Sequence, residues 1–132
     1  MFTILPIENK ELLNSYRPTN DTATLLSYTD NGNEIGHIAL ERRGDAIFII
    51  GFSLLGLDTN FDLITDLDAK QKEDVMWLVR SAGSYAVNRG LCMLCCDRVQ
   101  YYSIFLNVGF VPKDDIIILN LEKIFTKCEN CK

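Results

Sequence analysis

Three apolar segments joined by two tight turns constrain the fold of this 132-residue chain more than any other feature. The segment 22–29 is followed by the turn 30–33, whose Asn-Gly pair tolerates the positive φ angles of a two-residue hairpin. Residues 34–42 come next, and the Arg-Gly-Asp sequence at 43–45 turns the chain into 46–54. The pattern predicts three consecutive antiparallel strands.

The middle strand alternates between apolar and polar side chains. Ile38 and Leu40 alternate with His37 and Glu41. Because successive side chains of a strand point to opposite faces, one face of the sheet should be apolar and the other should carry polar groups.

A long amphipathic helix is predicted from 69 to 88. Asp68 and Gln71 stand at the spacing of a capping box, and Gly90 provides the end signal. The predicted buried face comprises Val75, Leu78, Val79, Ala82, Ala86 and Val87.

The remaining segments give shorter elements. We predict a strand at 2–5 that Pro6 ends, a helix at 8–16, a strand at 91–96, a helix at 98–108, and extended segments at 110–112 and 116–121. The segment 56–67 is compatible with a short helix. The predicted order is β-α-β-β-β-α-β-α-β, a single α/β (α+β) domain over residues 1–132.

Composition excludes several classes of protein. A hydrophobic content of 48% with 23% charged residues is typical of a globular domain, and no apolar run reaches the ~18 residues of a membrane span. The net charge is −5 and no basic cluster stands out, so we expect no nucleic-acid partner. The N-terminus lacks the pattern of a signal peptide, which favours a cytoplasmic protein.

Three stretches resemble the GCN5-related N-acetyltransferase (GNAT) family. Residues 34–45 are similar to its third strand and following turn, and 85–91 resembles the end of its central helix. The Gly-Phe segment at 104–111 is similar to its closing helix-to-strand signature. The resemblance implies a mixed, mostly antiparallel sheet flanked by helices. It also implies transfer of an acyl group from acetyl-coenzyme A to an amine of a small molecule or a protein.

The resemblance places a cofactor loop at the start of the central helix. Family members use the pattern Arg-x-x-Gly-x-Gly/Ala to hold the pyrophosphate, whereas residues 70–75 here contain neither glycine. Glu73 and Asp74 instead place negative charge in this register, and Lys70 and Lys72 remain as candidate phosphate contacts. Acetyl-coenzyme A is therefore a doubtful cofactor for this chain.

The resemblance also locates the acyl group and the catalytic acid. The acyl carbonyl would meet the backbone of the fourth strand at Phe52, Ser53, Leu54 and Leu55, between the fourth and fifth strands. The tyrosine that serves many members as general acid is replaced by Phe105, so Tyr101 and Tyr102, one turn earlier, are the candidates. By residue type, the candidates for the general base are Glu34, His37 and Glu41.

Two Cys-x-x-Cys pairs raise the question of metal binding. Cys92 and Cys95 fall on a predicted strand, where they would point to opposite faces, so we interpret them as core cysteines. Cys128 and Cys131 lie in a polar tail and are candidate metal ligands or a reversible disulfide, or have no such role. We do not expect zinc as a resident cofactor.

Three functions remain open at this point. The first is an acyl-coenzyme A-dependent N-acyltransferase with a lost or rebuilt pyrophosphate loop, and the second is a non-catalytic interaction or ligand-sensing module on the same fold. The third is a thiol-based role of the C-terminal pair. An open groove between the fourth and fifth strands would favour the enzyme, and a groove filled by side chains would favour the module. A homodimer is compatible with each.

Overall fold

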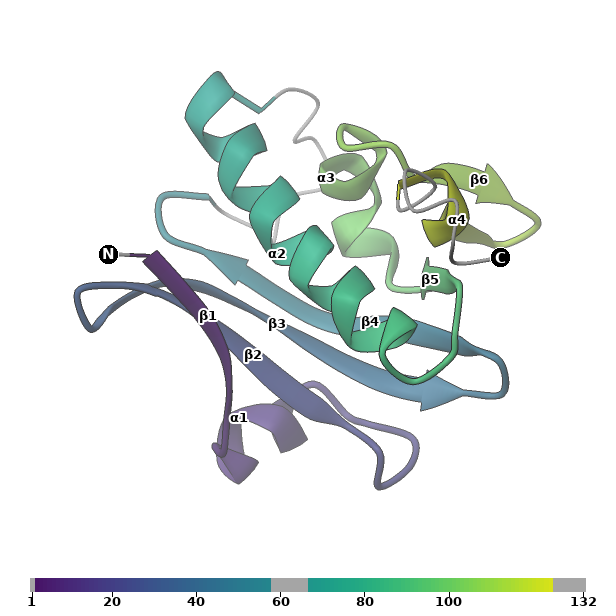
Figure 1. Cartoon of the computed structure of the whole chain (residues 1–132), viewed down its shortest axis with the longest axis horizontal. Coiled ribbons are helices and arrows are strands. Elements are labelled where there is room, and N and C mark those ends of the chain that lie inside the picture. The colour runs from purple at the N-terminus through teal and green to yellow at the C-terminus, as the bar shows by residue number, and fades with distance from the viewer. Residues whose placement is uncertain (1, 58–66, 125–132) are drawn as a thin grey trace.

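The computed structural model of the chain describes residues 2–57 and 67–124 (Figure 1). Within these residues seven strands form one sheet in the order β1-β2-β3-β4-β5-β7-β6, and β4 and β5 are the parallel pair. The strands are β1 (Phe2–Ile7), β2 (Thr24–Asp30), β3 (Asn33–Arg43), β4 (Ala46–Leu54), β5 (Met93–Cys96), β6 (Val111–Lys113) and β7 (Ile116–Asn120). The predicted mixed, mostly antiparallel sheet is confirmed.

Helices cover both faces of the sheet. The helical elements are α1 (Lys10–Ser15), α2 (Ala69–Val87), the 3-10 turn η1 (Val99–Tyr101), α3 (Tyr102–Leu106) and α4 (Leu121–Ile124). Figure 1 shows α2 crossing one face, whereas α1 lies on the other. No helix of the described residues is long and apolar enough to cross a membrane.

The strand meander forms as predicted. Asn31 and Gly32 both have positive φ, 53° and 88°, as the tight β2–β3 turn requires. Ile38 of β3 pairs with Leu26 of β2 and Phe52 of β4, and all three are buried beneath α2. The opposite face carries a smaller cluster, which α1 covers.

Helix α2 begins at the predicted capping box. The Asp68 carboxylate accepts from the Gln71 N–H at 2.7 Å, and the Gln71 side chain accepts from the Asp68 N–H at 3.1 Å. The predicted face is buried with the exception of Val87, the last residue of the helix, which is 42% exposed. Gly90, at φ 77°, then reverses the chain.

Other boundaries differ from the predictions for local reasons. Strand β1 continues through Pro6 to Ile7, because an edge strand tolerates a residue without an N–H. The predicted helix at 98–108 divides into η1 and α3, and the last extended segments pair as the hairpin β6–β7. Most of the ambiguous segment 56–67 lies outside the described residues.

Strands β4 and β5 are paired over a short stretch only. Their ladder comprises Ile47 with Leu94 and Phe48 with Cys95. Further along β4, the register with β3 shifts between Ala39 and Leu40, and Ile50 falls in this bulge. Beyond Phe48 the β4 edge is therefore not paired with β5, and other groups can contact its backbone.

Candidate functional site

Arg98 contacts the β4 edge where the resemblance places the cofactor. Its Nη1 atom donates to the carbonyl oxygen of Ile50 at 3.1 Å and to that of Tyr16 at 2.8 Å. Its Nη2 atom donates to the Arg17 carbonyl oxygen at 3.3 Å. One guanidinium thus holds the chain after α1 against β4.

Tyr101 contacts the same edge two residues further along. It is 5% exposed, and its hydroxyl forms a hydrogen bond with the backbone N–H of Phe52. Its ring meets that of Phe52 edge-on, with centroids 6.3 Å apart. Burial raises the pKa of Tyr101, although the Phe52 N–H opposes the shift, so the phenol is neutral at ordinary pH.

The four residues predicted to meet an acyl group lie at the end of β4 and directly after it, and they contact other parts of the protein. The Leu55 N–H donates to the Ile35 carbonyl oxygen at 2.7 Å, and the Leu57 N–H donates to that of Leu54 at 3.0 Å. The side chains of Phe52 and Leu54 are buried in the core, Ser53 is half-buried and paired with His37, and Leu55 is exposed. The Leu55 N–H and the Leu54 carbonyl oxygen are thus engaged within the protein.

Tyr16, His37, Glu34 and Ser27 form a network of polar side chains, the His37 network, on the α1 face of the sheet. The Tyr16 hydroxyl lies 2.6 Å from Nε2 of His37, whose Nδ1 lies 3.4 Å from a Glu34 oxygen. Ser27 donates to the other Glu34 oxygen at 3.0 Å. Burial, with the nearby Tyr101 and Glu34, raises the pKa of Tyr16 to about 12. The predicted candidates His37 and Glu34 are thus in contact, and the Tyr16 hydroxyl contacts the other ring nitrogen of His37.

The sequence did not point to Tyr16 or Ser27 as members of the His37 network. Their partners His37 and Glu34 lie on β3, far from Tyr16 and outside the β2 strand of Ser27. One indirect signal exists at Gly51, which stands on β4 beneath the Tyr16 ring. A Cβ atom at this position would collide with that ring. The glycine permits the close approach of α1 to the sheet.

Glu41 does not belong to the His37 network, and both of its carboxylate oxygens accept hydrogen bonds from other residues. Its oxygens accept from the Thr19 N–H at 2.7 Å, the Thr19 hydroxyl at 2.8 Å and the Arg43 Nε at 2.6 Å, and the residue is fully buried. Burial alone would raise the pKa of Glu41, but the bonds from Thr19 and Arg43 leave it below its ordinary value. Arg43 continues the network to Asp97 at 2.7 Å. This geometry suits an anchor for the segment after α1.

The two candidate tyrosines point to different places. Tyr101 faces β4, whereas the Tyr102 hydroxyl donates to the Asp115 carbonyl oxygen in the β6–β7 turn at 2.7 Å. Phe105, at the position of the family's tyrosine, is fully buried and packs against the Phe52 ring at 5.2 Å.

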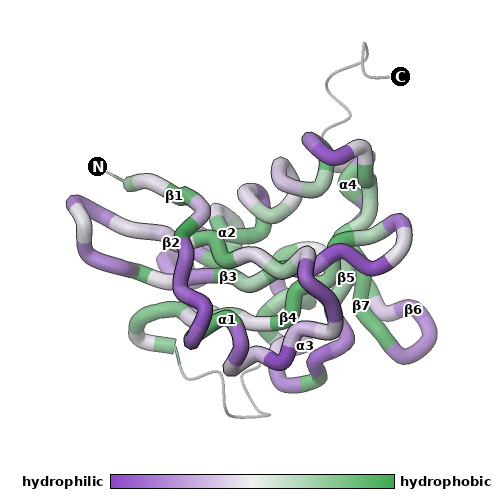
Figure 2. Tube along the Cα trace, turned by 90° about the horizontal axis from the view of Figure 1, so that it is seen from below, coloured by the Kyte–Doolittle hydropathy of each residue, from purple (hydrophilic) through white to green (hydrophobic). Residues whose placement is uncertain are grey.

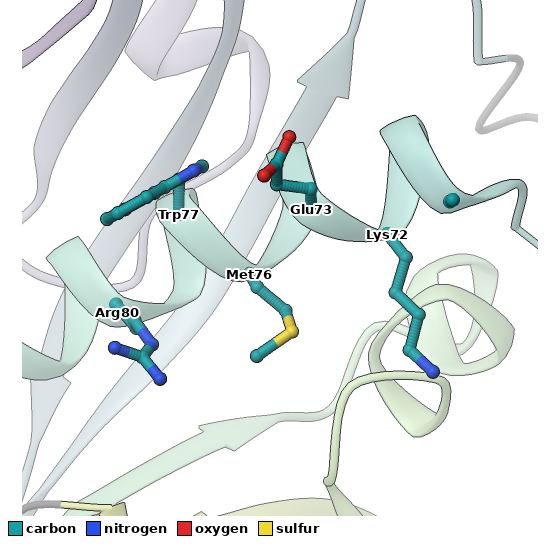
Figure 3. Close-up of a pocket in the computed structure, with 6 residues that line it drawn as sticks. Lys72, Glu73, Met76, Trp77 and Arg80 are labelled. Atoms are coloured by element: carbon teal, nitrogen blue, oxygen red, sulfur yellow. The ribbon is translucent and has the colours of Figure 1, made fainter.

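The two lysines predicted to contact phosphate also diverge. The Lys70 ammonium lies 3.0 Å from Asp74, which accepts a further bond from the Tyr28 hydroxyl at 3.0 Å. Lys72 instead lines a hollow of about 450 Å³ on the outer side of α2, with Trp77 and Arg80 among its neighbours (Figure 3). The two ammonium groups do not converge on one anion.

The cysteines of the described residues are not arranged for metal binding. Cys95 and Cys96 are buried, and burial raises their pKa values to about 11 and about 12, so both remain thiols. Cys92 is exposed, and its interpretation as a core cysteine is wrong, because β5 begins only at Met93. In residues 2–57 and 67–124 no three His, Cys, Asp or Glu side chains gather as a metal site. Cys128 and Cys131 lie outside this part of the chain, so their role stays a prediction.

Comparison with solved structures assigns the fold. The ribosomal-protein-S18-alanine N-acetyltransferase of Escherichia coli superposes with a TM-score of 0.58 at 15% identity, covering 92% of this chain and 94% of that chain. A GNAT family acetyltransferase from Elizabethkingia anophelis with acetyl-CoA bound gives 0.57 at 13% identity, covering 89% and 95%. An acetyltransferase of the GNAT family from Staphylococcus aureus gives 0.59 at 13% identity, covering 92% and 99%.

These likenesses show that the chain has the GNAT fold, as the resemblance implied. No model of a protein family matches the sequence, and no curated protein matches it either. Since the identities are between 13% and 15%, the likenesses show the architecture alone.

Proposed function

We propose that this chain is a GNAT-fold binding module whose acyl-thioester groove is closed by its own side chains. The observation that carries the proposal is the pair of contacts that Arg98 and Tyr101 make with Ile50 and Phe52. Both lie on the β4 edge beyond the last pairing with β5. An acyl thioester would have to displace both side chains before it could reach this backbone.

The start of α2 supports the same proposal. Anion sites at helix N-termini use free backbone N–H groups and the positive end of the helix dipole. Here the Asp68 carboxylate accepts from Gln71 N–H and brings its own negative charge. The nearby Lys70 is paired with Asp74. The residues present therefore do not fit a pyrophosphate, and the lost-loop interpretation is part of the proposal.

One observation favours a second candidate, an acyl-coenzyme A-dependent N-acyltransferase. The Tyr101 phenol is an acid of the type that acyl transfer to an amine requires, and it lies beside the Phe52 N–H. On this candidate the acceptor is an amine of a small molecule or a protein, and Tyr101 moves when the groove opens. His37, Glu34 and Tyr16 would then form a proton path on the α1 side.

Calorimetric titration of the reduced protein with acetyl-coenzyme A tests the proposal. We expect no heat of binding and no thermal shift at millimolar ligand for the unaltered chain. Binding at micromolar strength, about 8 kcal/mol, would contradict a closed groove.

The same titration with a Tyr101→Phe variant, together with an assay of coenzyme A release for both proteins, separates the two candidates. Loss of acyl transfer with unchanged acetyl-coenzyme A affinity would identify the phenol as the acid of an enzyme. The binding module predicts that neither protein releases coenzyme A when a set of primary amines is supplied.

A further inference from the structure

The sheet face opposite α2 is only partly covered by α1. The residues of α1 and its flanks pack on Leu25, Ala39 and Ile50, which belong to β2, β3 and β4. Figure 2, seen from the α1 side, shows β7 as a hydrophobic strand to one side of this helix, next to the hydrophilic β6–β7 turn. Strands β5 and β7 therefore present a face that α1 does not cover.

Apolar side chains line a hollow on this uncovered face. Its volume is about 510 Å³, within the range of ligand and anchor sites. The apolar lining consists of Ala46, Phe48, Met93, Cys95, Ile116 and Ile118. The alternate residues Ile47, Leu94 and Ile117 face the core beneath α2, so the sheet is apolar on both sides here.

The rim of the hollow is acidic. Asp45 comes from the β3–β4 turn, and Asp114 and Asp115 come from the β6–β7 turn, against one basic residue, Lys113. Arg43 lies over the outer Phe48 ring at 4.4 Å, but its charge is balanced by Glu41 and Asp97. The hollow thus combines an apolar floor with carboxylates at both ends.

We propose that this hollow docks a segment of a partner protein that carries apolar side chains flanked by Lys or Arg. Apolar anchors would fill the floor, and the cations would lie at the three rim carboxylates. A second copy of this chain fits less well, because it would bring the same acidic rim against itself. Pro112 has no N–H and β6 is three residues long, so the segment docks on the face rather than as an added strand at this edge.

The inference deepens the proposed function, since it gives the chemical class of partner that the binding module recognises. It rests on that function only for its biological meaning, because the hollow shares no lining residue with the contacts of Arg98 and Tyr101. Titration with acetyl-coenzyme A reports on the groove alone, and the peptide experiment below reports on the hollow alone.

The test uses synthetic twelve-residue peptides and the full chain with isotopic labels. One peptide alternates Leu with Lys, a second replaces each Lys by Glu, and a third replaces each Leu by Ser. We expect the first to bind and to shift the amide resonances of Phe48, Met93, Ile116 and Ile118. Its affinity should fall with added salt, and the other two peptides should bind at least tenfold more weakly.

Charge variants keep the fold and test the rim. The double variant Asp45→Asn with Asp115→Asn should weaken the Leu-Lys peptide by about five- to tenfold, since each rim charge contributes modestly. Asp21→Asn removes an exposed carboxylate elsewhere and should leave the affinity unchanged. Three results would overturn the proposal: no binding at millimolar peptide, shifts centred on Trp77 of the α2 hollow, or a dimer in ultracentrifugation whose contact shifts Ile116 and Ile118.

Discussion

Arg98 donates to the carbonyl oxygen of Ile50 at 3.1 Å, which links the end of β5 to the bulge of β4. The same Nη1 atom donates to the Tyr16 carbonyl oxygen at 2.8 Å. Arg17, whose φ is 57°, adds a third carbonyl oxygen. A non-glycine residue with this φ costs free energy, so the guanidinium helps to hold a backbone that would otherwise relax.

Substituting Arg98 by Ala should lower the free energy of unfolding by about 1–3 kcal/mol, because part-buried carbonyl groups lose a charged donor. It should also speed hydrogen exchange at the β4 amides beyond Phe48. Urea unfolding and exchange measured by NMR check both effects. Arg80→Ala, on the exposed side of α2, is the matched control and should stay within about 0.5 kcal/mol. Equal effects of the two substitutions would show that the Arg98 contacts do not stabilise the groove.

The fold was predictable from signals that act within a few residues. The Asn31–Gly32 turn, the alternation of His37 with Ile38, and the Asp68 capping box are each local. They agree with one another, and the three-strand meander and α2 therefore emerged with nearly correct bounds. Where a local signal misled, as at Pro6, the sheet position decided the outcome, because only an edge strand accepts a proline there.

The candidate site was predictable in part. The strand pattern placed His37 and Glu41 on one face of the sheet, as the structure shows. It did not predict their different partners, Tyr16 for His37 and Thr19 for Glu41. Tyr16 meets His37 across 21 residues, and Arg98 meets Ile50 across 48. Such contacts depend on how α1 and the segment after β5 pack, and no periodicity in the sequence carries that information.

Gly51→Ala should displace α1 from the sheet, since the added Cβ collides with the Tyr16 ring. We expect a loss of about 1–3 kcal/mol in the free energy of unfolding, the usual cost of overpacking. In a Tyr16→Ala background the same substitution should cost less than about 0.5 kcal/mol, because the obstacle is gone. A double-mutant cycle by urea unfolding measures this coupling. Additive effects would mean that Gly51 is required for a reason other than the tyrosine.

Glu41 should make the stability of this protein sensitive to acid. Burial works to raise the pKa of Glu41, but Thr19 and Arg43 hold it below the ordinary value of 4.5. The unfolded chain therefore binds the proton first as pH falls, and the stabilisation present above pH 4.5 is lost below it. Glu41→Gln should cost about 1–3 kcal/mol at pH 7 and show a flatter decline between neutral and acid pH. Parallel declines in both proteins would assign the acid sensitivity to other carboxylates.

Tyr16 should give the opposite dependence at alkaline pH. Burial, followed by the influence of Tyr101 and Glu34, raises the pKa of Tyr16 from 10.0 to about 12, so the folded state favours the neutral phenol. The unfolded chain then loses its proton first, and the stabilisation present below pH 10 is lost as pH rises toward 12. Tyr28, whose pKa burial and Asp74 also raise to about 12, adds to the same decline.

Tyr16→Phe isolates the Tyr16 contribution. It should cost about 0.5–1.5 kcal/mol at neutral pH, because the hydrogen bond to His37 is lost, and it should make the alkaline decline shallower. Urea unfolding across this pH range, with the tyrosinate absorbance followed in parallel, measures both. An unchanged decline in the variant would mean that Tyr28 or Tyr101, and not Tyr16, couples folding to alkaline pH. The segment after α1 would then be held chiefly by Arg98, through the carbonyl oxygens of Tyr16 and Arg17, and by the bonds of Thr19 to Glu41.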